Sequence, residues 1–202
     1  MRPILIALLT ACASAPAPAP VAPAPPPTTP ALPAVKPTES LVAPMAKLAF
    51  MRGLWAGRAT GVERDGKPYS VTQVERMGPL LGGDVLVMEG RGYRDDNTTG
   101  FNALGVASYN QQTQKYELRS YAQGYSGTFE FNVTPTGYVW EAPAGPHAVT
   151  RFTATVTATT WHEVGEFVSE GGTPKQIFEM NLKRVGETDW PLGAPPSPQL
   201  GR

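Results

Sequence analysis

The stretch Gly53-Leu54-Trp55-Ala56-Gly57-Arg58-Ala59-Thr60-Gly61 limits the folds open to this chain more than any other. Side chains alternate between the two faces of a strand, so one face here carries Trp55 and otherwise only glycine and alanine. Small residues on an inward face let a strand bend sharply or let another backbone approach closely. The pattern is typical of the first strand of a small closed barrel, with the indole plugging one end. An ordinary glycine-containing edge strand is the alternative, and the stretch alone does not separate the two.

Beyond Gly61 the chain consists of short strand-like runs separated by clusters of Gly, Pro, Asn and Asp. Strands and helices do not alternate, which disfavours a parallel sheet. The pattern predicts an all-β fold, an antiparallel up-and-down barrel of about 8–10 strands with a short N-terminal helix. A β-sandwich is the competing architecture. The expected strands are residues 55–63, 69–77, 85–93, 101–109, 115–121, 126–134, 138–141, 148–156, 160–168 and 175–185.

Four apolar residues before the first strand recur at helical spacing: Leu41, Met45, Leu48 and Met51. Pro44 suits the first turn of a helix, and Gly53 suits a stop. The spacing predicts an amphipathic helix over residues 44–52, which would close one mouth of the barrel.

The last two strands predict their own register. A turn at residues 170–173 places Gly165 opposite Phe178, Glu163 opposite Met180 and Trp161 opposite Leu182. One face then carries Trp161, Phe167, Phe178, Met180, Leu182 and Arg184, with Glu163 as a carboxylate among apolar side chains. A buried carboxylate is costly, so Glu163 is expected to have an Arg, Tyr or Trp partner. The opposite face is expected to be solvated; it carries His162, Val164, Glu166, Glu179, Asn181 and Lys183.

The motifs Gly53-x-Trp55-x-Gly57 and Lys183-Arg184 resemble those of the calycin group, which comprises lipocalins, fatty-acid-binding proteins and nitrobindin-like barrels. The resemblance implies that Trp55 packs against Arg184 in a cation–π contact that closes the barrel. From about Leu48 to Val185 the chain is also similar to a bacterial lipocalin-like domain family of unknown function. That family has no established activity, so the similarity indicates fold more than function. The segments that carry it are Leu80-Leu81-Gly82-Gly83, Glu89-Gly90-Arg91-Gly92-Tyr93, Ala103-Leu104-Gly105-Val106-Ala107-Ser108-Tyr109, Trp161-His162-Glu163-Val164-Gly165-Glu166 and Phe178-Glu179-Met180-Asn181-Leu182-Lys183-Arg184.

The N-terminal residues predict an exported lipoprotein. Met1-Arg2 and a short apolar run precede Leu9-Thr10-Ala11-Cys12, which resembles a bacterial lipobox. Residues 1–12 are therefore interpreted as a signal peptide ending at Cys12, the lipidated residue. Residues 13–40 are mostly Ala and Pro, which predicts a disordered tether. The apolar run is at the lower limit of length for a signal sequence, which leaves open a true start upstream of Met1.

Residues 41–186 are expected to form the barrel domain, and residues 187–202 a disordered tail in which Trp190 has no structural role. Because Ala13 follows the cysteine, the lipobox resembles those of outer-membrane lipoproteins, with the domain facing the periplasm. A secreted or cytosolic protein with a chance lipobox is the alternative.

Charge and residue types exclude several function classes. The 17 basic and 17 acidic residues give a formal net charge of zero, which argues against nucleic acid as a partner. The single cysteine, Cys12, excludes a cysteine-based metal site. His162 and Glu166 share a strand face but lie about 13 Å apart, too far to share one metal ion. Nitrobindin-like barrels, which the chain resembles, bind haem through a histidine late in the chain, and the last strand here has none. No Gly-x-Ser-x-Gly motif marks a nucleophile. No metal and no cofactor are expected.

The leading functional hypothesis is a membrane-tethered barrel that binds a small apolar or amphipathic molecule, with Glu163 and an arginine at its polar end. Arg91, Arg119 and Arg151 are the candidate cations. Two alternatives remain: an envelope protein-interaction module with a filled barrel, or a barrel enzyme that uses Glu163 or Glu75 as acid or base. The expected ligand-binding residues are Trp55, Glu75, Tyr109, Tyr121, Trp140, Arg151, Trp161, Glu163, Phe178 and Met180.

Overall fold

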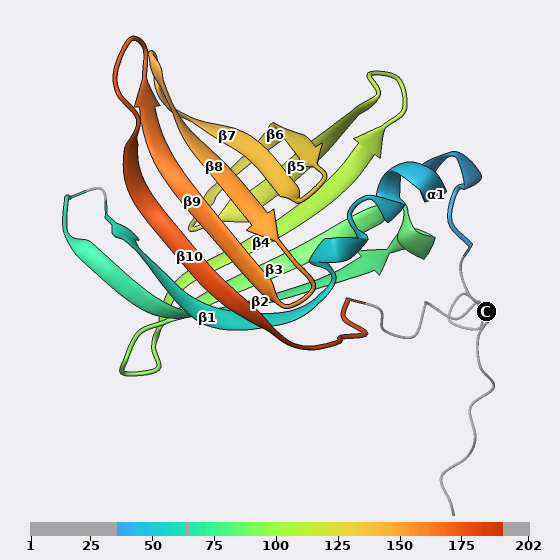
Figure 1. Cartoon of the computed structure of the whole chain (residues 1–202), viewed down its shortest axis with the longest axis horizontal. Helices are drawn as coiled ribbons and strands as arrows, with labels where there is room; N and C mark the ends of the chain where they lie inside the picture. Colours follow the sequence, from blue (N-terminus) through green and yellow to red (C-terminus); the bar gives the residue numbers. More distant parts are fainter. Residues whose placement is uncertain (1–35, 64, 192–202) are drawn as a thin grey trace, which may run out of the picture. The chain divides into compact units, whose positions relative to one another are not determined.

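The computed structural model describes residues 36–63 and 65–191, and these form a closed ten-stranded antiparallel barrel (Figure 1). Neighbouring strands follow the order of the chain, and β1 pairs with both β2 and β10. The predicted up-and-down barrel is confirmed, and the sandwich alternative is wrong. The strands are β1 (Gly53–Val62), β2 (Pro68–Leu80), β3 (Val85–Tyr93), β4 (Thr99–Asn110), β5 (Lys115–Ala122), β6 (Tyr125–Thr134), β7 (Gly137–Gly145), β8 (Ala148–Val156), β9 (Thr160–Ser169) and β10 (Lys175–Gly186).

The seam between β1 and β10 depends on Gly57. A Cβ added at Gly57 would overlap the carbonyl oxygen of Asn181 and lie 2.9 Å from the Cα of Leu182. The two backbones therefore approach closely at this point, as the small residues of β1 predict. Two positions earlier, Trp55 is fully buried opposite Arg184, whose guanidinium carbon lies 4.8 Å from the centre of the indole. The cation–π contact that the resemblance implies is present, and β1 is not an edge strand.

The N-terminal helical segment differs from the prediction. Helix α1 (Glu39–Ala46) begins and ends earlier than expected, and a 3₁₀ turn, η1 (Ala49–Met51), follows it. Pro44 lies inside α1 rather than in its first turn. Proline lacks an N–H, so α1 lacks one backbone hydrogen bond at this position, and the apolar spacing continues across the break between α1 and η1.

The two helical segments nonetheless close one mouth of the barrel, where β1 begins (Figure 1). Leu48 and Met51 are almost completely buried, and Trp55 Nε1 donates a hydrogen bond to the Met51 carbonyl oxygen at 2.9 Å. The Tyr116 hydroxyl donates to the Pro44 carbonyl oxygen at 2.8 Å, which ties α1 to β5. Within residues 36–63 and 65–191, no helix is long and apolar enough to cross a membrane.

The register predicted for the last hairpin is confirmed. β9 and β10 pair Gly165 with Phe178, Glu163 with Met180 and Trp161 with Leu182. Phe167 is the exception on the apolar face, because it lies beyond a bulge between Gln176 and Phe178, near the end of β9, and its side chain is exposed. On the outer face His162 and Glu179 contact each other at 3.1 Å, and both are partly exposed.

The described part of the expected tail has a structural contact that the sequence analysis missed. The chain after β10 returns to β2, where the ring of Trp190 lies 4.5 Å from the guanidinium carbon of Arg76. Gly78 permits this approach, because a Cβ there would overlap the carbonyl oxygen of Trp190. Cys12 and the lipobox lie outside the described residues, as do most of the tether and residues 192–202.

Candidate functional site

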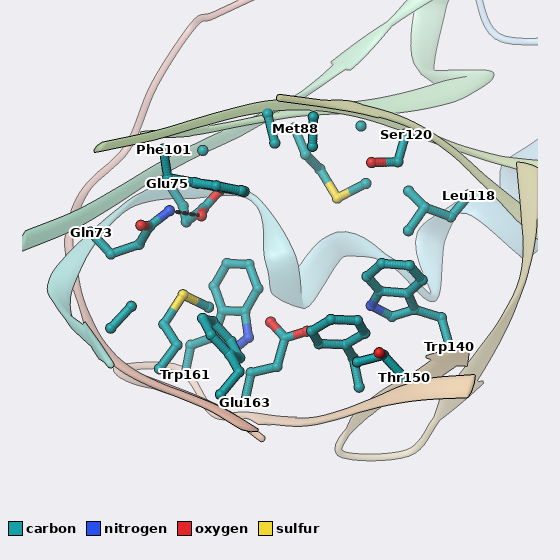
Figure 2. Close-up of a pocket in the computed structure, with 18 of the residues that line it drawn as sticks. Gln73, Glu75, Met88, Phe101, Leu118, Ser120, Trp140, Thr150, Trp161 and Glu163 are labelled. Carbon is teal, nitrogen blue, oxygen red and sulfur yellow. Dashed lines mark hydrogen bonds between the residues drawn. The ribbon is translucent and has the colours of Figure 1, made fainter. Parts of the chain in front are cut away.

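The barrel is hollow. Its interior holds a cavity of about 440 Å³, within the range of small-molecule sites (Figure 2). Residues from all ten strands line it, because every second side chain of each strand points inward. Most of the lining side chains are apolar, among them Met88, Phe101, Leu118, Phe131, Phe152, Phe178 and Met180.

The cavity has a floor and a mouth. The floor lies toward η1, where Trp55 and Trp161 meet edge to face with ring centres 5.8 Å apart. At the other end the cavity reaches Val62, Tyr69 and Ile177, which lie where β1 ends and where β2 and β10 begin. Val62 is 45% exposed, so this end borders solvent. The interior is therefore a cup that is closed on the helical side.

Glu163 is the more deeply buried of two carboxyl groups in this cup, with 7% of its surface exposed. It lies on β9 two residues from Trp161, and its Oε2 accepts a hydrogen bond from the Tyr138 hydroxyl at 2.9 Å. This tyrosine is a partner of the expected kind. Burial raises the pKa of Glu163 to about 7, although hydrogen bonds from Tyr138 and Trp140 favour its charged form. Burial and the nearby Glu163 also raise the pKa of Tyr138 well above its usual value.

Glu75 lies on another wall of the cup, on β2 (Figure 2). Its Oε1 accepts a hydrogen bond from Gln73 Nε2 at 2.6 Å, and it retains partial exposure because it borders the cavity. Gly90 of β3 makes room for this carboxyl, since a Cβ there would lie 2.5 Å from Oε1. Burial raises the pKa of Glu75 to about 8; the Gln73 hydrogen bond opposes this rise, and the charges of Glu163 and Glu89 add to it.

No positive side chain accompanies these carboxyls. Among the described residues that line the cavity there is no Lys, Arg or His. Arg151 points outward, where it pairs with Glu141 of the neighbouring strand at 2.6 Å, and Arg91 pairs with Glu89 at 2.6 Å. Arg119 is exposed on β5. The hypothesis of an arginine at the polar end of the ligand is therefore wrong, because strand alternation directs all three outward.

Six of the ten expected ligand-binding residues line the cavity: Glu75, Trp140, Trp161, Glu163, Phe178 and Met180. Trp55 lies in the floor beneath it. Tyr109 packs against Tyr116 at a ring distance of 5.0 Å and does not border the cavity. Tyr121 and Arg151 are on the outer face, since their strand neighbours Ser120 and Thr150 point inward.

Several polar residues that line the cavity were not predicted from the sequence: Gln73, Ser120, Tyr138 and Thr150. Tyr138 reaches Glu163 across two strand pairings, since it pairs with Ala154 and Ala154 pairs with Glu163. The alternation of side chains along β5 and β8 is enough to predict that Ser120 and Thr150 point inward. The contact between Tyr138 and Glu163 can be predicted only when the pairing registers of β7, β8 and β9 are all known.

The arrangement suits binding better than metal chemistry. Within residues 36–63 and 65–191, no group of three or more His, Cys, Asp and Glu side chains is placed to hold a metal ion. The two carboxyls are the chemically active groups of the cup, and both can exchange a proton near neutral pH.

Comparisons with known proteins agree on the fold alone. The sequence matches no protein-family model, and no curated protein matches it. The crystal structure of Rv2717c from M. tuberculosis, a lipocalin-like barrel, is similar with a TM-score of 0.55 and 14% identity, over 71% of this chain and 98% of that chain. The structure of the S-type phycobiliprotein lyase CPES from Guillardia theta has a TM-score of 0.46 and 11% identity, over 71% of this chain and 94% of that chain. The similarity to Rv2717c shows that the chain has a lipocalin-like fold.

The buried carboxyls make stability depend on pH. A folded-state pKa of about 8 for Glu75 and about 7 for Glu163 exceeds the usual 4.5, so the folded state holds protons that the unfolded state releases. The free energy of unfolding should therefore fall between pH 4.5 and 8, by on the order of several kcal/mol in total. Glu75→Gln and Glu163→Gln should each remove part of this fall and be more stable than wild type at pH 8.5.

Urea unfolding from pH 5 to 9 measures this trend. Glu130→Gln serves as the control, because Glu130 is on the surface and pairs with Lys115 at 2.8 Å. This variant should keep the wild-type slope. A wild type as stable at pH 9 as at pH 5, with no gain from either cavity variant, would contradict the assignment.

Proposed function

We propose that this protein binds a small apolar or amphipathic molecule inside its barrel. The observation that carries the proposal is the hollow interior of about 440 Å³, with apolar walls and a few polar groups at fixed positions. The alternative of a filled barrel that serves only as an interaction scaffold does not fit this interior.

The positions of the two carboxyl groups predict how the bound molecule is oriented in the cavity. Glu75 pairs with Trp55 in the floor, and Glu163 is two residues from Trp161, so both carboxyls lie deep in the cup. The walls toward the mouth carry Phe101, Ile177 and Phe178. A molecule with a polar end and an apolar body therefore fits with its polar end at the floor and its body toward the mouth.

One observation also favours a second function, an acid–base enzyme. Burial brings the pKa of Glu75 to about 8 and that of Glu163 to about 7, near the values that suit proton transfer at neutral pH. The two functions differ in what becomes of the bound molecule: a binding protein releases it unchanged, whereas an enzyme converts it.

We also propose that the barrel is a lipoprotein domain of the bacterial outer membrane that faces the periplasm, and that it belongs to the bacterial lipocalin-like family it resembles. Support for the anchor comes from Leu9-Thr10-Ala11-Cys12 and from the Ala/Pro composition of residues 13–40. Cys12 would carry the lipid, and the part of residues 13–40 that precedes α1 (Glu39–Ala46) would set the distance from the membrane.

If the ligand binds inside the cup, a bulky side chain that fills the cavity should weaken binding. Ser120 lines the cavity, and Ser120→Trp should weaken binding of the uncharged fluorophore N-phenyl-1-naphthylamine by about tenfold or more, because the indole occupies the ligand's space. Arg119→Trp adds the same side chain to the outer face of the same strand and should bind as wild type does. Fluorescence titration measures both, with thermal unfolding to confirm that each variant folds. Equal binding by Ser120→Trp and wild type, or no saturable binding by wild type, would contradict the proposal.

The anchor predicts the chemistry of Cys12. Expressed with its full N-terminus in a Gram-negative host, the wild type should incorporate radiolabelled palmitate and fractionate with the outer membrane. Cys12→Ala should do neither, while the melting temperature of its barrel stays unchanged. Wild-type protein recovered without lipid in the soluble fraction would refute the anchor.

A further inference from the structure

The two carboxyls of the cup share a cavity that no Lys, Arg or His of residues 36–63 and 65–191 lines, and this limits the kinds of ligand that the cavity favours. Figure 2 shows Glu75 and Glu163 directed into the same space, and only β1 and β10 separate the strands that carry them. We propose that the cavity selects a lipophilic amine, a molecule with a protonated amino group on an apolar body, whose ammonium is held by Glu75 and Glu163. This inference rests on the proposed function and names the class of ligand for that same site.

Both carboxyls have hydrogen-bonding capacity left for a ligand. An ionised carboxylate offers about four acceptor positions. Glu75 receives a hydrogen bond from Gln73, and Glu163 receives hydrogen bonds from Tyr138 and Trp140. An ammonium carries three donors and no acceptor, so it complements these remaining acceptor positions.

The groups around each carboxyl supply no competing cation. Glu75 lies between Trp55 of β1 and Gly90 of β3, with Gln73 beside it on β2. Glu163 lies between Ala154 of β8 and Met180 of β10, with Tyr138 of β7 donating to it.

Two arginines that neighbour Glu75 in the sheet, Arg184 and Arg76, already have partners. Arg184 contacts the ring of Trp55 and pairs with Glu187 at 2.6 Å, while Arg76 pairs with Glu89. An ammonium placed between Glu75 and Glu163 would therefore be their counter-ion, and a buried ion pair of this kind avoids the cost of an isolated buried charge.

The aromatic walls suit a cation as well. Trp140 and Phe152 stack with ring centres 4.4 Å apart, and Phe152 meets Phe178 edge to face at 6.0 Å. The faces of Trp, Tyr and Phe rings attract cations, most strongly where water is excluded. A carboxylate ligand such as a fatty acid meets the opposite situation, because it would face two acids and no positive side chain.

Binding of an amine should be linked to protons. The pKa of Glu75 is about 8 and that of Glu163 about 7 because both are buried, so an ammonium that ionises them releases protons. Amine affinity should therefore rise with pH between 6 and 8, by up to about tenfold per pH unit for each carboxyl that ionises. Affinity for a carboxylate ligand should fall over the same range.

Three ligands of equal chain length test the inference: decylamine, decanol and decanoate, titrated by calorimetry at pH 6, 7 and 8. At pH 8 decylamine should bind at least about tenfold more tightly than decanol, and decanoate should bind most weakly. In Glu75→Gln/Glu163→Gln the preference for decylamine should shrink to less than about threefold, while decanol binds at least as tightly as it does to wild type. Glu130→Gln, changed on the surface, should keep the wild-type preference.

The outcomes separate this inference from the proposed function. Equal binding of decylamine and decanol, or tightest binding of decanoate, overturns the amine preference and leaves the ligand-binding function in place. Preference for decylamine that persists in the double variant also overturns it, because the ammonium would then be held elsewhere. Failure of all three to bind overturns both proposals.

Discussion

The close approach of β1 and β10 at Gly57 is the constraint on which the rest of this structure depends. Only a residue without a side chain lets the two backbones meet there, and the pairing that results sets Trp55 against Arg184. Once this seam is closed, each strand has a partner on both sides and the inward and outward faces are determined throughout. The cavity is a consequence of closure: ten strands enclose more space than their inward side chains fill.

The same closure fixes the chemistry of the interior. Alternation on β2 and β9 sends Glu75 and Glu163 inward, while it sends Arg91, Arg119 and Arg151 to the outer surface. Two carboxyls thus lie in an apolar space to which the described residues contribute no cation, and burial favours their neutral form. This arrangement lowers the stability of the folded protein at alkaline pH, which is the kind of cost that proteins carry at binding sites. It also explains why a positively charged ligand would gain more from this cup than a neutral or negative one.

The sequence predicted the parts of the fold that depend on local pattern. The register of β9 and β10 followed from one short turn and one apolar face, and the contact of Trp55 with Arg184 followed from resemblance. The prediction misplaced helix α1 because the apolar spacing continues across the break between α1 and η1.

The site was less predictable because it depends on several registers at once. Tyr121 and Arg151 were assigned to the ligand by residue type, although alternation on their own strands points them outward. The contact between Tyr138 and Glu163 involves three strands. Gly90 leaves room for the carboxyl group of Glu75 on the neighbouring strand. Neither contact can be predicted from the sequence without knowing how the strands of the barrel pair.

The central claim is that two carboxyls share an apolar, cation-free interior, and their titration tests it most directly. Carbon-detected NMR of protein labelled with ¹³C at the glutamate carboxyl carbon, with Glu75→Gln and Glu163→Gln as assignment variants, follows each group in the ligand-free protein. The structure predicts midpoints of about 8 for Glu75 and about 7 for Glu163. Two midpoints close to 4.5, the usual pKa of a glutamate, would mean that water or a cation already satisfies these groups, and would contradict the account.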